Sequence, residues 1–501
     1  MEYISTRGDQ TRYSSAQVIK QGIAPDGGLF VPVQIPVLDI SQFKDMASQR
    51  YQERAVQILS LFLSDYSHDE LQTMVEAAYD EEKFGEHPAP LVQINKYCDQ
   101  EYLLELWHGP TAAFKDMALQ LLPHLMKAAI EKTGEQAEVC VLTATSGDTG
   151  KAALEGFKDV DGTSVVVFYP AEGVSPAQKL QMVTQQGQNC HVAAVEGSFD
   201  DTQNGVKSIF KDNEFKEKLH SQGKILSSAN SINWGRLVPQ IIYYCSAYAD
   251  LIKSEKIEPG EKINLVVPTG NFGNILAAWY AYKMGVPVNK LICASNRNKV
   301  LSDFIRNGHY DRRRDFFVTN SPSMDILVSS NLERLLFELT GRDSDKVGEW
   351  MQALSETGHY KIDHDTLKKL QTVFVGGFAD EKGTLKTIRD VYDRTDHVVD
   401  THTAVGFNVF SRYAARSKDT AKTIFISTAS PLKFSGAVCD AVFGNGYSNG
   451  RSDKVLLEEL SAESGLGIPE TLRDLQQKPV LHDKKITPED MQDYVESKLL
   501  P

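Results

Sequence analysis

The chain has 501 residues, of which 41% are hydrophobic and 24% charged, enough for two to four globular domains with large cores. Its formal net charge of −14 disfavours nucleic acid or a membrane surface as a partner, and no apolar run approaches the length of a membrane span. The six cysteines are scattered singly and the histidines do not cluster at metal spacing, so we expect no disulfide framework and no metal site.

Residues 1–90 read as an N-terminal domain. The first nine residues lack the apolar core of a secretory signal and the composition of a transit peptide, so we expect a cytoplasmic protein. A turn at Pro25–Gly28 precedes a short apolar run, and charged helical patterns follow from about residue 40 to residue 78. The Gly- and Pro-containing stretch at 85–90 marks the end of this domain.

The next segment contains an unusually placed lysine. A turn at His108–Pro110 follows a short apolar run, and a helical pattern begins at Ala112. At 100° per residue, one polar stripe of this helix consists of Asp116, Gln120, His124 and Lys127. Lys115 lies outside that stripe, in the first turn, where desolvation and the helix dipole both favour the neutral amine. The alternative is a lysine that extends to solvent or pairs with an acid.

Beyond this helix, short apolar runs alternate with helical patterns, which predicts βαβ units and parallel sheets flanked by helices. The predicted strands are 138–144, 164–169, 190–195, 262–267, 290–294, 398–400 and 423–427. The intervening helices are predicted at 151–157, 175–186, 236–252 and 275–284. Residues 300–395 are charged and largely helical in pattern, and residues after about 447 are polar and wrap around the core. The resulting fold class is α/β, with domains at 91–255 and 256–501 and a helical insertion at about 300–395.

Two loops that join a strand to a helix could bind anions. In the loop at 269–274, glycines let the backbone approach a ligand, and the free amides of the following helix favour a phosphate. The loop at 145–151 lacks the spacing of a nucleotide-binding loop, and its hydroxyls and amides would suit a carboxylate. Either loop could instead be a purely structural turn.

Two further residues, Thr428 and Arg236, could belong to the same binding site. Thr428 directly follows a predicted strand, at the sheet edge where ligands bind, and Arg236 is a fork-shaped anion donor at the start of a helix. Singly, each is also compatible with a turn or a surface ion pair. Together with a partly buried lysine and a phosphate loop, they match the needs of pyridoxal phosphate: a Schiff-base lysine, a glycine-rich phosphate loop and a partner for the ring nitrogen.

The same segments resemble the threonine synthase family. The resemblance rests on residues 108–116, 144–150, 230–239, 268–274 and 427–434, in the same order as in the family, and on the leading stretch at 27–32. It spans about residues 1–440 and is closest to the longer bacterial and fungal class. It implies a fold-type-II pyridoxal phosphate enzyme, tryptophan synthase β-like, that converts O-phospho-L-homoserine and water to L-threonine and phosphate, the last step of threonine biosynthesis.

The resemblance also implies roles for individual residues. Lys115 would bind the cofactor, and its phosphate would be held by Gly270, Asn271, Phe272, Gly273 and Asn274. Thr428 would face the ring nitrogen, and the ring hydroxyl and substrate carboxylate would lie near Ser146, Asp148 and Thr149. The candidates for the substrate phosphate are Lys151, Asn233 and Arg236. Many fold-type-II relatives have Asn where this chain has Asp148, and a carboxylate leaves the protonation of that contact open.

Two other functions stay open at this point. One is a different fold-type-II enzyme, such as threonine dehydratase, which needs no second phosphate site. The other is a catalytically silent, threonine-synthase-like binding protein. For the threonine synthase reading we expect the small molecule O-phospho-L-homoserine as the partner, and a monomer or a homodimer.

Overall fold

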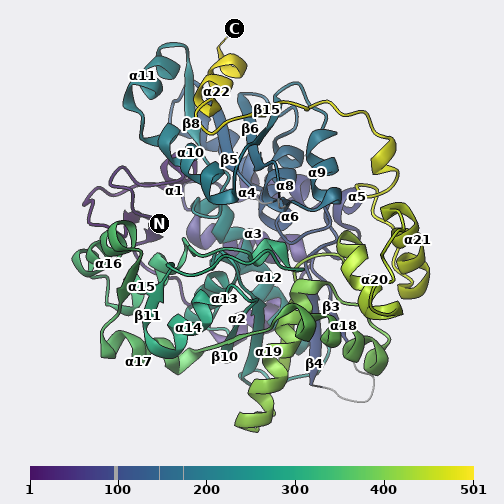
Figure 1. The fold of residues 1–501 in the computed structure, drawn as a ribbon. Coiled ribbons are helices and arrows are strands. Elements are labelled where there is room, and N and C mark those ends of the chain that lie inside the picture. Colours follow the sequence, from purple (N-terminus) through teal and green to yellow (C-terminus); the bar gives the residue numbers. More distant parts are fainter. Residues whose placement is uncertain (95–99, 146, 173, 501) are drawn as a thin grey trace.

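The computed structural model describes residues 1–94, 100–145, 147–172 and 174–500. Its main strands form two sheets, a smaller one in the upper half of Figure 1 and a larger one in the lower half. The smaller sheet has the order β15-β7-β6-β5-β8 and is parallel throughout. Its strands are β5 (Glu138–Ala144), β6 (Thr163–Pro170), β7 (Cys190–Val195), β8 (Lys224–Ser227) and β15 (Lys485–Ile486).

The larger sheet has the order β13-β10-β9-β14-β4-β3. All its neighbouring strands are parallel except β3, which runs antiparallel to β4 at one edge. Its strands are β3 (Leu91–Gln93), β4 (Glu101–Glu105), β9 (Ile263–Pro268), β10 (Val288–Ser295), β13 (Phe374–Phe378) and β14 (Thr423–Ser427). The predicted bounds of β5, β7 and β14 are therefore confirmed.

The central strands are buried on both faces, which explains their uninterrupted apolar sequences. In β6, Val165 and Val167 belong to the largest core cluster, whereas Val166 and Phe168 point to the opposite face and a separate cluster. The helices around this sheet are α8 (Asp148–Phe157), α9 (Pro176–Val183), α10 (Phe199–Lys211), α11 (Asn213–Ser221) and α22 (Met491–Leu499).

Helix α12 (Trp234–Lys253) lies in the middle of the molecule (Figure 1). It packs against α13 (Gly273–Lys283) and against α3 (Tyr51–Phe62) of the N-terminal segment. That segment pairs β1 (Tyr3–Ser5) with β2 (Phe30–Pro32) in antiparallel fashion. Its other helices are α1 (Ser15–Gln21), α2 (Ile40–Met46), α4 (His68–Ala78) and α5 (Glu81–Phe84).

The region at 300–395 is helical, as predicted, but it also supplies the edge strand β13 of the larger sheet. Its helices are α14 (Val300–Asn307), α15 (Leu332–Leu339), α16 (Ser344–Thr357), α17 (His364–Val373) and α18 (Glu381–Thr395). The predicted strand at 398–400 is wrong. Asp400 is instead the N-cap of α19 (Thr401–Ser417), and its carboxylate accepts from the N–H groups of His402 and Thr403.

The C-terminal region crosses from the larger sheet to the smaller one. Helices α20 (Ser435–Phe443) and α21 (Asp453–Ser464) pack beside the larger sheet, and the yellow segment in Figure 1 then runs to β15. There β15 pairs with β7, and α22 packs on α10. No helix of the described residues is both long and apolar enough to span a lipid bilayer.

Candidate active site

A cavity of about 1170 Å³ lies where the carboxyl ends of strands from both sheets meet. Its wall includes Ala144 at the end of β5, Pro268 at the end of β9 and Thr428 just after β14. Ligands of parallel α/β proteins bind at this edge. The predicted site residues that line the cavity are Lys115, Thr149, Arg236, Gly270, Asn271, Phe272, Gly273, Asn274 and Thr428.

Lys115 is fixed at the cavity by hydrogen bonds between its own segment and the chain that follows β14. The N–H of Phe114 donates to the carbonyl of Thr428 at 2.8 Å, and the N–H of Ser430 donates to the carbonyl of Ala112 at 3.1 Å. Ala112 has a φ of +56°, in the left-handed region that residues with a side chain rarely adopt. This sharp turn directs the chain so that Lys115 and Thr428 line the same cavity.

The environment of Lys115 makes its charged form less favourable than in solvent. Only 13% of its side chain is exposed, and burial lowers the pKa of the amine. The Asp148 carboxylate, 3.5 Å from Lys115 Nζ, opposes that shift, while the charges of Lys433 and Arg236 add to it. The prediction of a partly buried lysine is therefore confirmed.

The helix predicted from Ala112 is wrong in detail. Lys115 is the N-cap of a short helix, α6 (Asp116–Leu119), and a second helix, α7 (Leu122–Lys132), begins separately with a proline in its first turn. The predicted polar stripe does not face solvent at its start, because Asp116 is fully buried. Its carboxylate accepts from the N–H and the hydroxyl of Thr111, each at 2.7 Å. Burial raises the pKa of Asp116 to about 6.

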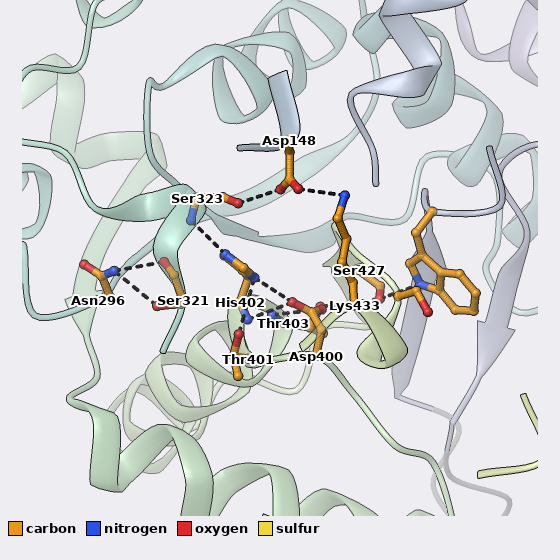
Figure 2. A network of polar contacts seen from close by, with 12 residues as sticks. Asp148, Asn296, Ser321, Ser323, Asp400, Thr401, His402, Thr403, Ser427 and Lys433 are labelled. Carbon is orange, nitrogen blue, oxygen red and sulfur yellow. Dashed lines mark hydrogen bonds and ion pairs between the residues drawn. The ribbon is translucent and has the colours of Figure 1, made fainter. Parts of the chain in front are cut away.

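Asp148, the first residue of α8, is a buried carboxylate surrounded by donors (Figure 2). Its Oδ1 contacts Lys433 Nζ at 2.7 Å and accepts from Gln178 Nε2 at 2.8 Å. Its Oδ2 accepts from the Ser323 hydroxyl at 2.6 Å and lies 3.5 Å from Lys115 Nζ. Although burial alone would raise it, the charges of Lys433 and Lys115 hold the pKa of Asp148 well below its usual range. These contacts favour the ionised form of the carboxylate.

The turn before Asp148 requires glycine. Gly147 has a φ of +140°, and a Cβ at this position would lie 2.5 Å from Gln178 Cδ. The same glutamine donates to Asp148, so the turn brings its amide directly onto the carboxylate. Gly147 thus lets α9 and the start of α8 approach closely.

A histidine that the sequence analysis did not select also lines the cavity. Nε2 of His402 accepts from the backbone N–H of Ser323 at 3.1 Å, so its proton must be on Nδ1, which donates to Asp400 at 2.8 Å. Figure 2 shows this chain of contacts running from Asp148 through Ser323 to Asp400. In the parts of the chain that the structure covers, no three His, Cys, Asp or Glu side chains gather as metal ligands would.

The glycine loop is strained where the helix begins. Phe272, the N-cap of α13, has a φ of +65° and is 1% exposed, with its ring stacked on that of Phe374. This conformation turns the chain into α13, whose first amide groups have no intrahelical partner. A Cβ on Gly270 would lie 3.0 Å from the carbonyl oxygen of Ser323, so the loop packs closely against the segment that contacts Asp148.

Asn274, the last residue of this loop, carries a buried amide donor. Its Oδ1 accepts from the hydroxyls of Tyr243 and Tyr244, each at 2.6 Å. An atom that accepts from two hydroxyls must be the amide oxygen, so these two bonds fix the orientation of the amide and the position of Nδ2. Nδ2 is buried, has no partner within the described ranges, and belongs to a residue that lines the cavity. An acceptor on a bound ligand that reaches this atom would satisfy it.

Arg236 is a second buried donor without a carboxylate. It is 2% exposed, its Nη1 donates to the carbonyl of Ala229, and its Nε has no hydrogen-bond partner among the residues the structure describes. Burial lowers the pKa of Arg236 to about 10, and the group still remains a cation at neutral pH. A buried guanidinium in a cavity wall is an anion-binding group.

The other predicted substrate residues are placed differently. Lys151 does not appear in the cavity wall, because it pairs with Glu155 at 2.7 Å and donates to Gln185. Asn233 is the N-cap of α12, and its amide donates to the carbonyls of Ile19 and Ser228. The side chains of Lys151 and Asn233 therefore make contacts within the fold and do not line the cavity. Ser146 lies outside the described residues.

Comparison with known proteins gives three family matches along the chain. A model of the threonine synthase N terminus matches residues 2–79, a model of pyridoxal-phosphate-dependent enzymes matches residues 83–429, and a model of the threonine synthase C-terminal region matches residues 403–486.

Individual relatives agree with these matches. Human threonine synthase-like 1 is 41% identical over 85% of this chain, although the match spans only 58% of that protein's length. Threonine synthase of Saccharomyces cerevisiae is 37% identical over 93% of both chains. The crystal structure of a pyridoxal-phosphate-bound threonine synthase from Brucella melitensis superposes with a TM-score of 0.86 at 35% identity, covering 100% of each chain. The chain therefore belongs to the threonine synthase family of fold-type-II, pyridoxal-phosphate-dependent enzymes.

Proposed function

We propose that the protein is a threonine synthase that converts O-phospho-L-homoserine and water to L-threonine and phosphate. The observation that carries this proposal is a pair of buried donors on two residues that line one cavity, Asn274 Nδ2 and Arg236 Nε, neither of which has a partner among the described residues. A cofactor with one phosphate and a substrate with another would occupy two such positions. Threonine dehydratase chemistry needs only the first.

The residues around the cavity fit pyridoxal phosphate. Lys115 would bind it, the loop at 270–274 with the Asn274 amide would hold its phosphate, and the Thr428 hydroxyl would face its ring nitrogen. The bound cofactor would supply the electron sink for carbanion chemistry at the substrate.

Lys115 would carry the proton transfers. Its amine would remove protons from the α- and β-carbons of the substrate and return a proton to the γ-carbon after phosphate leaves. A lowered pKa suits an amine that must act in turn as base and acid near neutral pH. Asp148 would influence the reaction through its contacts with Lys115 and with the ring hydroxyl of the cofactor. Thr149 would bind the substrate carboxylate.

Arg236 would bind the substrate phosphate, which makes it the residue that separates the two enzymatic alternatives. The test compares phosphate release from phosphohomoserine with keto-acid release from threonine, for the wild type, Arg236→Lys and Arg236→Met. We expect phosphate release by the wild type and a KM for phosphohomoserine raised about tenfold or more in Arg236→Met, because a charge-assisted hydrogen bond contributes about 1.5–3 kcal/mol. Cofactor absorption should be unchanged in both variants.

Other results would point elsewhere. Keto-acid release from threonine without phosphate release would identify a dehydratase. Binding of phosphohomoserine with no turnover would identify a silent binding protein. The site is built from one chain, which fits a monomer or a homodimer with independent sites. The free, buried cysteines at 140, 190, 245, 293 and 439 fit a reducing, cytoplasmic setting.

A further inference from the structure

Lys433 is a buried cation that the proposed reaction does not yet use. It lies in a short 3₁₀ helix (Pro431–Phe434) after β14, and its side chain is completely buried. Its Nζ contacts Asp148 Oδ1 at 2.7 Å and donates to the carbonyl of Thr111 at 2.9 Å. Both partners are acceptors, as an ammonium group requires. Burying such a group without an anion would be costly, so Asp148 is its necessary partner.

Two lysines therefore share one carboxylate, but not equally. Lys433 contacts Oδ1 at 2.7 Å, whereas Lys115 is 3.5 Å from Oδ2, whose closer partner is the Ser323 hydroxyl at 2.6 Å. Gln178 supplies a further donor to Oδ1. When Lys115 gives up its proton, the charge on Asp148 stays compensated by Lys433 and its hydrogen bonds.

The other titratable groups nearby do not take the place of Lys433 beside Asp148. Arg236 adds positive charge near Lys115, while Asp116 is an acid whose carboxyl interacts with the charge of Lys433. His402 is in the form that accepts from the Ser323 N–H and so adds no positive charge. Among the groups named here, Lys433 and Lys115 are the two cations in direct contact with Asp148.

We propose that Lys433 is a positioning residue for catalysis: it is the permanent counter-ion of Asp148, and it thereby leaves Lys115 free to exchange its proton with the substrate. The catalytic role of Lys433 rests on the proposed function, whereas the ion pair between Lys433 and Asp148 involves only residues of this chain. Asp148 and Lys433 form a unit in which the acid is tolerated because the lysine is present. Without Lys433, the carboxylate would hold Lys115 in its charged form.

The test measures how readily Lys115 loses its proton. In the full-length protein freed of cofactor, reductive methylation of Lys115 is followed by peptide mass spectrometry as a function of pH. An opposite charge at this distance shifts a titration by about 1–3 pH units. We expect Lys433→Met to move the midpoint for Lys115 upward by about that amount, and Lys433→Arg, which keeps the charge, to leave it near the wild-type value.

A second substitution distinguishes this role from a structural one. In Lys433→Met combined with Asp148→Asn, neither member of the pair is charged, so the midpoint should return to within about one pH unit of the wild type. Lys151→Met is the matched control, because Lys151 is likewise a buried lysine but pairs with Glu155. It should leave the midpoint of Lys115 unchanged.

The inference is overturned if Lys433→Met leaves the midpoint in place, or if the upward shift persists in the double variant. Should Lys433→Met fail to fold, Asp148→Asn alone should shift the midpoint of Lys115 in the opposite direction. It leaves the charge of Lys433 uncompensated, so the midpoint should fall. Adding Lys433→Met to Asp148→Asn should raise the midpoint again. A wild type that releases no phosphate yet shows these shifts would refute the proposed function while supporting the ion-pair unit.

Discussion

Asn274 offers a direct test of the phosphate-binding loop. In Asn274→Asp, both tyrosine hydroxyls keep an acceptor, so the packing of α12 against α13 is preserved. The change replaces the buried, unpartnered Nδ2 donor with a carboxylate oxygen. The two short tyrosine bonds, each 2.6 Å, favour the ionised form of the new side chain.

The expected effect is large. A carboxylate about 4 Å from a phosphate repels each unit of its charge by about 4 kcal/mol at an effective dielectric constant of about 20. Since every 1.4 kcal/mol is a factor of ten, pyridoxal phosphate should bind about a thousandfold more weakly. The assay is an absorbance titration of the cofactor-free protein, with thermal unfolding of that same form as a check on folding. Tyr244→Phe is the control, because Tyr243 still holds the amide. An affinity for Asn274→Asp within about threefold of the wild type would refute the placement of the phosphate.

Three other predictions concern the same region. Lys115→Ala should abolish the visible absorption of the bound cofactor and all turnover while the circular dichroism spectrum stays native; turnover at the wild-type rate would contradict the assignment of this lysine. Gly147→Ala should lower the free energy of unfolding by about 1–3 kcal/mol, measured in urea, because its φ of +140° and the nearby Gln178 leave no room for a Cβ. Asp116 binds its proton more tightly in the folded protein, where burial raises its pKa to about 6, than in the unfolded chain. Its contribution of about 3 kcal/mol is therefore complete below about pH 4 and lost as the pH rises through about 6. Asp116→Asn should flatten that part of the stability profile, and an unchanged slope between pH 4 and pH 6.5 would contradict this assignment.

The parts of the fold that depend on local sequence were predictable. Strands β5 and β7 are continuous apolar runs between turn residues, and their bounds follow from that pattern. The strand β13 was not found because Gly376 and Gly377 interrupt its apolar run, and the structure shows why they are there: Cβ atoms would press on Ser302 and Val409. The helix around Lys115 was predicted too long because the break before Pro123 was not recognised.

The site was predictable only where a single segment carries it. The loop at 270–274 and Lys115 could be selected one at a time from their sequence context. Lys433 and His402 could not, because their importance depends on contacts with Asp148 and Ser323, which come from distant parts of the chain. One signal was available: Asp400 followed by Thr401 and His402 has the form of a helix N-cap, which would have excluded the predicted strand.

The crossing of the C-terminal region to the smaller sheet affects how the protein is made. During synthesis β7 emerges long before β15, and the hydrogen bond from the Tyr494 hydroxyl to the carbonyl of Val192 joins residues 302 positions apart. Until residues 485–499 arrive, one edge of the nascent sheet presents unpaired backbone groups, which can pair with another chain. Changes in the segment that carries β15 across should therefore reduce the yield of folded protein in the cell more than they reduce the activity of the molecules that complete folding.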